Sequence, residues 1–156
     1  MVRPGVALYG VNPTPGRANP MQPVVQVQAR IVQVRKVTKG ETVGYGGVWS
    51  ARHAGRIAVV AVGYGDGYPR SLSSTDSSPG ADAIVAGRRC RLAGRISMDL
   101  LAIDIGELPD GAAKRGDLVT LIGDDITVDA VANVAGTIGY EILTGLGRRY
   151  HRDYRS

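Results

Sequence analysis

The stretch from Ile57 to Arg70, IAVVAVGYGDGYPR, contains residues whose types and spacing could do chemistry. An apolar, β-branched run from Ile57 to Val62 has the length of a buried strand and stops at Gly63. Three glycines then alternate with Tyr64 and Asp66. Glycine at every second position allows positive φ and the close approach of other groups. The pattern predicts a phenol presented at the end of a rigid strand.

The phenol of Tyr64 has two interpretations when it is considered alone. It could exchange protons with a substrate, but a phenol has an ordinary pKa near 10 and needs neighbours that favour the phenolate at neutral pH. It could equally be a half-buried turn tyrosine, because phenols are common amphipathic surface groups. A second motif is needed to decide between them.

Two further motifs accompany this stretch: RPGVALYG, beginning at Arg3, and AGRISMD, from Ala93 to Asp99. With VGYGDGYPR, in this order and spacing, they resemble the alanine racemase family over the chain from its start to about Gly145. The resemblance is to the C-terminal part of that enzyme only. In the family an N-terminal (β/α)8 barrel carries the lysine that binds pyridoxal 5′-phosphate, and no lysine of this chain has a matching context.

The resemblance implies a role for each matching residue. Tyr64 matches the tyrosine that serves as base on the L-alanine side, and Met98 matches the residue whose backbone N–H meets the substrate carboxylate. Arg3 would meet the pyridine nitrogen of the cofactor, while Gly5 and Val6 would offer N–H groups to its phosphate. Without the motif, Met98 would be taken for an ordinary core methionine that fills a gap.

Other polar residues of the motifs have supporting roles in this interpretation. Arg95 is a candidate to favour the Tyr64 phenolate, Asp99 would orient its segment, and Asp66 would support the turn. Some members of the family have a tyrosine beside the cofactor phosphate at the position of Arg148. That departure puts this phosphate contact in question, although an arginine also binds anions.

The family is dimeric, and each active site takes its tyrosine from the partner subunit. The resemblance therefore implies a homodimer in which Tyr64 and Met98 act on alanine bound to the barrel of the second subunit. The function expected is interconversion of L- and D-alanine, with D-alanine supplied for peptidoglycan, and no activity without the barrel. The alternative is a non-catalytic racemase-like β-domain that serves as a protein-interaction module.

Composition sets limits on these functions. The 156 residues are 44% apolar with no Phe, one Trp and 22 glycines, which favours one domain of short strands and turns. The net charge of +5 comes from scattered arginines without an aromatic platform, so no nucleic-acid partner is expected. His53 and His151 lack ligands at metal spacing, so no metal is expected.

The expected location is the cytoplasm. The single cysteine, Cys90, excludes an intrachain disulfide and fits a reducing compartment. Its neighbouring arginines could lower its pKa, although a half-buried strand cysteine is the alternative. No apolar run approaches 18 residues and no signal peptide is evident, so no membrane association is expected.

The fold expected is mainly β: a β-barrel-like domain at residues 23–156 with a short helical tail, preceded at residues 1–22 by the end of a barrel and a linker. Val2 to Tyr9 resembles the end of a strand followed by a turn, loosely packed. The serine-rich segment 71–82 predicts a mobile surface loop. Strands are expected at 24–37, 42–49, 57–62, 83–92 (a hairpin), 97–105 and 117–122, and helices at 128–135 and 140–146.

Overall fold

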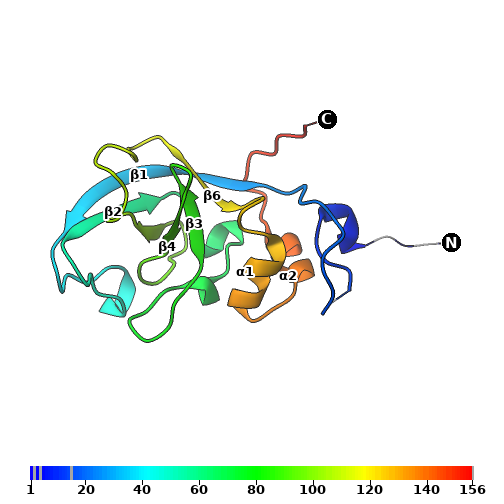
Figure 1. The fold of residues 1–156 in the computed structure, drawn as a ribbon, viewed down its shortest axis with the longest axis horizontal. Helices are drawn as coiled ribbons and strands as arrows, with labels where there is room; N and C mark the ends of the chain where they lie inside the picture. The colour runs from blue at the N-terminus through cyan, green and yellow to red at the C-terminus, as the bar shows by residue number, and fades with distance from the viewer. Residues whose placement is uncertain (2, 4, 15, 156) are drawn as a thin grey trace.

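A single antiparallel sheet organises the chain in the computed structural model, which describes residues 1, 3, 5–14 and 16–155. Its strand order is β4-β3-β6-β1-β2-β5. An isolated bridge between Leu92 and Ile103 joins the two outer strands, so the sheet curls into a nearly closed barrel (Figure 1). The strands are β1 (Val27–Val37), β2 (Gly55–Val60), β3 (Asp82–Val85), β4 (Arg88–Arg91), β5 (Leu101–Asp104) and β6 (Leu118–Ile122). The predicted mainly β, barrel-like fold is confirmed.

Strand β1 is the longest and connects the two halves of the sheet. Val27, Ala29 and Ile31 face inward and alternate with exposed residues, as the sequence pattern predicts. The first part of β1 pairs with β6 and the second part pairs with β2. A register shift between Ile31 and Gln33 accompanies this change of partner, and bulges of this kind help a sheet to bend into a barrel.

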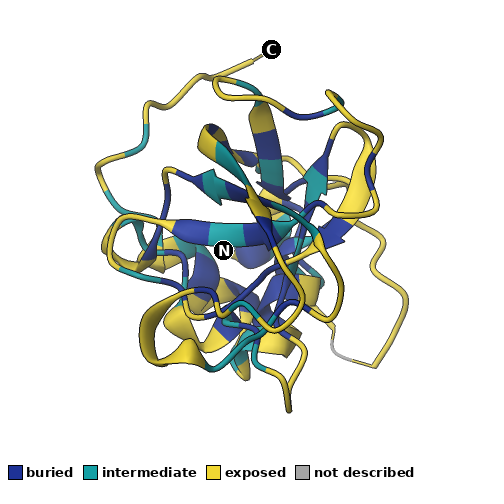
Figure 2. Ribbon diagram, turned by 90° about the vertical axis from the view of Figure 1, so that its left-hand side faces the viewer, coloured by how far each residue is buried: buried dark blue, intermediate teal, exposed yellow. Residues whose placement is uncertain are grey.

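Two short helices, α1 (Val128–Ala135) and α2 (Gly139–Gly145), lie beside one end of the barrel (Figure 1). The Thr127 hydroxyl caps α1 by accepting a hydrogen bond from the Ala130 amide at 3.1 Å, as expected from its residue type. Val131 and Ile142 join the core of the sheet, and Figure 2 shows the buried segments gathered at the centre of the molecule. The helices thus close one end of the core.

Two strand predictions are wrong. Residues 42–49 form a 3-10 turn, η2 (Tyr45–Gly47), with only an isolated bridge between Thr42 and Ser50. Glycines 44, 46 and 47 all have positive φ, which no regular strand accommodates. The predicted strand end near the N-terminus is instead η1 (Val6–Tyr9), also 3-10, with Val6 packed into the core rather than loose. Val2, Pro4, Pro15 and Ser156 of the predicted segments lie outside the described residues.

The serine-rich segment differs from its prediction as a surface loop. It begins with η4 (Arg70–Leu72), in which Leu72 is fully buried, and continues through Ser74, which is also buried. The Ser74 amide donates to the Gly94 carbonyl, and its hydroxyl accepts from Gly80. The exposed residues are Arg70 and Ser71 at its start and residues 76–79 at its tip. Among the described residues, no helix combines the length and the apolar character needed to cross a bilayer.

Candidate functional site

Tyr64 lies at the rim of the barrel, where the chain leaves β2. Val62 is still buried, and the chain then turns through η3 (Tyr64–Asp66). The Asp66 carboxylate accepts a hydrogen bond from the Gly63 amide at 2.9 Å, and the Gly67 amide donates to the Tyr64 carbonyl at 3.1 Å. The predicted support of this turn by Asp66 is confirmed. The Tyr64 residue is 47% exposed, so its side chain is presented outward.

Backbone hydrogen bonds bring the second motif against this turn. The Tyr64 amide donates to the Ser97 carbonyl at 3.0 Å, and the Gly65 amide donates to the Met98 carbonyl at 2.8 Å. A Cβ on Gly63 would lie 2.2 Å from the Ser97 carbonyl oxygen, so only glycine permits the approach. The structure therefore places Tyr64 and Met98, which the sequence analysis selected separately, on adjoining turns.

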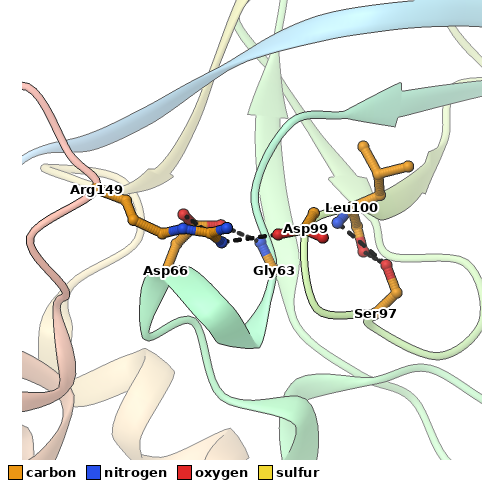
Figure 3. A network of polar contacts seen from close by, with 6 residues as sticks. All are labelled: Gly63, Asp66, Ser97, Asp99, Leu100 and Arg149. Carbon is orange, nitrogen blue, oxygen red and sulfur yellow. Dashed lines mark hydrogen bonds and ion pairs between the residues drawn. The ribbon is translucent and has the colours of Figure 1, made fainter.

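The Met98 turn leaves its own amide available. Ser97 and Leu100 close the turn, because the Ser97 amide donates to the Leu100 carbonyl at 2.9 Å and the Leu100 amide donates to the Ser97 hydroxyl at 3.1 Å (Figure 3). Within the described part of the chain, no acceptor is recorded for the Met98 amide. Met98 is 50% exposed rather than a core gap-filler.

Below the turn, the chain is closely packed. Tyr68 is fully buried, and Tyr150 packs beside the same core. Neither phenol oxygen has a hydrogen-bond partner among the described residues. Burial, with Asp66 nearby, raises the pKa of Tyr150 to about 12, and burial likewise raises the pKa of Tyr68. A Cβ on Gly67 would lie 1.8 Å from the Gly145 carbonyl oxygen, where α2 ends.

Sequence reasoning missed Arg149, which it did not select as a site residue. The Arg149 guanidinium contacts Asp99 at 2.7 Å and Asp66 at 3.5 Å (Figure 3). Each motif thus contributes a carboxylate to one arginine. The signal available in the sequence was weak. Asp66 lies two positions after Tyr64 and Asp99 directly follows Met98, but the sequence does not indicate which cation pairs with either carboxylate.

The Arg95 side chain lies near η2, and no hydrogen bond joins it to Tyr64 among the described residues. Its guanidinium lies against η2, where a Cβ on Gly46 would come within 2.8 Å of Arg95 Nη1. Its backbone also approaches Gly44 closely. The expected role of Arg95 in favouring the phenolate therefore stays a prediction.

The predicted cofactor-binding residues form a separate group beside α2. The Val6 amide makes only a long hydrogen bond, 3.5 Å, to the Tyr140 hydroxyl, and a Cβ on Gly5 would lie 2.9 Å from the same oxygen. Arg3 is exposed. Helix α2 thus touches Gly5 through Tyr140 and approaches the Tyr64 turn through Gly145.

Other features do not coincide with this site. A cleft of about 800 Å³ lies near the start of β2, lined by residues that include Trp49, His53 and Asp76, but neither Tyr64 nor Met98 lines it. Tyr64 and Met98 are exposed and lie outside this cleft.

Cys90 is buried on β4, and burial raises the pKa of its thiol, contrary to the lowering considered from its arginine neighbours. No group of three or more metal-ligating side chains occurs among the described residues.

Two proteins similar in sequence to the chain are both alanine racemases. An alanine racemase from Methylobacterium sp. (strain 4-46) is 54% identical over 154 residues, which are 99% of this chain and 41% of that protein. A biosynthetic alanine racemase from Agrobacterium fabrum is 45% identical over 160 residues, covering 99% of this chain and 41% of the relative. The chain therefore spans about two fifths of the length of these relatives.

Solved structures give the same result for the fold. The crystal structure of biosynthetic alanine racemase from Pseudomonas aeruginosa matches with a TM-score of 0.89 and 41% identity, over 99% of this chain and 42% of that one. Alanine racemase from Bartonella henselae with covalently bound pyridoxal phosphate matches with a TM-score of 0.87 and 39% identity, over 98% and 41% of the two chains. The family model for "Alanine racemase, C-terminal domain" matches residues 24–154. The chain thus belongs to the alanine racemase C-terminal domain family.

Proposed function

We propose that this chain supplies the proton-transferring half of a pyridoxal-phosphate-dependent alanine racemase. The observation that carries the proposal is the pairing of an exposed Tyr64 phenol with the available Met98 amide, held on adjoining turns by backbone hydrogen bonds. A base and a carboxylate-binding donor at fixed relative positions are what abstraction of a proton next to a carboxylate requires. The names of the relatives supply the substrate.

The residues near η1 are compatible with the cofactor. Val6 has an amide held only by a long contact, Gly5 has no side chain to obstruct an anion, and Arg3 is an exposed cation. Backbone N–H groups beside glycine suit a phosphate, and a cation suits a pyridine nitrogen. Arg3, Gly5 and Val6 would hold pyridoxal 5′-phosphate together with a barrel domain, to which residues 1–22 would connect residues 23–156.

The chain's own residues then have defined tasks. Pyridoxal 5′-phosphate, when bound, withdraws electrons from the α-carbon of the amino acid. As the phenolate, Tyr64 takes the α-proton from L-alanine at its oxygen; as the phenol, it returns a proton to that face. Met98 donates its backbone N–H to the alanine carboxylate, so the contact needs nothing from the thioether. Asp66 keeps the Tyr64 turn closed through the Gly63 amide.

The open surface around the two turns supports a site completed by a second subunit. Tyr64 and Met98 lie outside the cleft near the start of β2, yet proton transfer at carbon benefits from exclusion of water. The barrel of a partner subunit in a homodimer would supply the missing wall. The chain alone would then be inactive. The complete enzyme would work in the cytoplasm and supply D-alanine for peptidoglycan.

The rival function is a racemase-like domain that has become a protein-interaction module. The exposed apolar residues at the rim, such as Tyr64, Met98 and Leu100, would suit either role. Addition of a separately produced alanine racemase barrel domain with pyridoxal phosphate distinguishes the two. L- to D-alanine conversion should appear with the wild-type chain and be lost with Tyr64→Phe. Stable association without conversion would instead support the interaction module.

A further inference from the structure

The guanidinium of Arg149 lies over the Tyr64 turn and touches both motif turns. Its Nη1 contacts the Asp99 carboxylate at 2.7 Å and that of Asp66 at 3.5 Å (Figure 3). The same nitrogen would lie 2.8 Å from a Cβ on Gly65, so the glycine leaves room for it. Gly65 is also the residue whose amide bonds the Met98 carbonyl.

The segment that carries Arg149 is anchored by other contacts. The Gly147 amide donates to the Asp66 carbonyl at 2.9 Å, and Tyr150 packs against the barrel core. The arginine therefore extends from a fixed backbone and not from a loose end. Loss of its side chain would leave these anchors in place.

The two carboxylates have different connections. Asp66 holds the Gly63 amide with one oxygen and receives Arg149 on the other. Asp99 directly follows Met98. Arg149 thereby joins the turn that presents the phenol to the turn that presents the carboxylate-binding amide.

Two of the three charged side chains are largely exposed, which limits the contribution of the ion pairs to the stability of the fold. The Arg149 and Asp99 side chains are 53% and 52% exposed, and that of Asp66 is 16% exposed. Ion pairs of this kind change a folding equilibrium by at most about fivefold. Their effect should be local, on the relative position of the two turns.

We propose that Arg149 is a positioning residue: its contacts with Asp66 and Asp99 fix the Tyr64 turn against the Met98 turn in the geometry that proton transfer needs. The catalytic part of this inference rests on the proposed function. The joining of the turns does not, and it is measured separately.

The first experiment measures amide hydrogen exchange at Tyr64 and Gly65 in the 156-residue chain. Arg149→Met should accelerate exchange of both amides by about fivefold, the most that an exposed ion pair provides. Arg149→Lys, which keeps a cation, should restore part of the protection. Arg155→Met, which removes a charge whose recorded partner is Asp153, is the matched control and should change neither amide. Unchanged exchange in Arg149→Met would overturn the proposal.

The second experiment adds the barrel domain and follows exchange of the α-proton of L-alanine into D2O. Arg149→Met should slow this exchange by about fivefold, the same factor as the loss of the joined geometry, with partial rescue by Arg149→Lys and an unchanged rate in Arg155→Met. Faster amide exchange with a normal α-proton rate would overturn the positioning role. If the wild-type chain shows no α-proton exchange, the proposed function fails, while the amide experiment still decides whether Arg149 joins the turns.

Discussion

The two faces of the η3 turn differ sharply although they come from the same motif. Tyr64, on the outer face, is 47% exposed, whereas Tyr68, on the inner face, is completely buried. The outer face is joined to the neighbouring Met98 turn by backbone hydrogen bonds and, through Asp66 and Asp99, by Arg149. The inner face packs against α2 and the core through Gly67 and Tyr68. An exposed face that presents the proposed base is thus combined with a tightly packed support, and the two should respond differently to substitution.

The largest expected effect separates the two tyrosines by activity. With the barrel domain present, Tyr64→Phe should lower the rate of L- to D-alanine conversion by about 10²- to 10⁴-fold, because it removes the proposed general base. Tyr68→Phe should leave the rate nearly unchanged, because its hydroxyl is buried away from the surface that carries Tyr64. Steady-state rates measured for both variants at equal folded concentration check the difference. Equal losses would abolish the distinction between the faces.

The next effect tests the support through glycine. Gly67→Ala puts a methyl group 1.8 Å from the Gly145 carbonyl and forces φ of +92 on alanine. Strain of about 1–2 kcal/mol and overpacking of about 1–3 kcal/mol should together destabilise the fold by roughly 3 kcal/mol. Gly40→Ala is the control, since φ there is +83 and nothing lies within 4 Å. Urea unfolding should show a cost of only about 1–2 kcal/mol for the control. Equal losses of stability in the two variants would mean that the packing around Gly67 accommodates the methyl group without further cost.

A smaller effect concerns alkaline pH. The folded-state pKa of Tyr150 is raised by burial to about 12, above the ordinary value near 10, and that of Tyr68 is raised as well. The unfolded chain therefore loses these protons first, so the stabilisation is complete below about pH 10 and decreases as pH rises towards about 12. Denaturant titrations across this range should show that decrease, and Tyr150→Phe should reduce its slope. If Tyr150→Phe lost stability with pH as steeply as the wild-type chain, the Tyr150 phenol would be exposed to solvent rather than buried.

The smallest expected effect is that of Tyr68→Phe on stability at neutral pH. Its hydroxyl is buried without a recorded partner among the described residues, so its removal should be neutral or stabilising by up to about 1 kcal/mol. Thermal unfolding of the variant against the wild-type chain measures this change. A destabilisation of about 2 kcal/mol would show that the hydroxyl is satisfied in solution, as by a bound water.

Much of the fold was predictable because burial left a regular pattern. The alternation along β1 and the apolar run of β2 reproduce their strands to within a few residues, and α1 was predicted with its bounds. Residues 42–49 were misassigned because their aromatic and β-branched residues suggested a strand while three glycines with positive φ formed a turn. Glycine permits either conformation, so local sequence could not decide.

The candidate site was predictable only where a motif carried it. Tyr64 and Met98 were selected from two separate stretches, and the backbone contacts between their turns came from the structure. Arg149 was missed because an arginine in a basic segment ordinarily faces solvent, and its two carboxylates are distant in sequence. Long-range charge pairing leaves no periodic signal.

The central claim is that Tyr64 serves one face of the substrate, and the most direct measurement compares exchange of the α-protons of L- and D-alanine into D2O. The chain is combined with a barrel domain for this purpose, either as wild type or as Tyr64→Phe. The variant should lose exchange from L-alanine by at least about 100-fold, the lower range for a general base, while D-alanine still exchanges. Retention of L-alanine exchange at the wild-type rate would contradict the account.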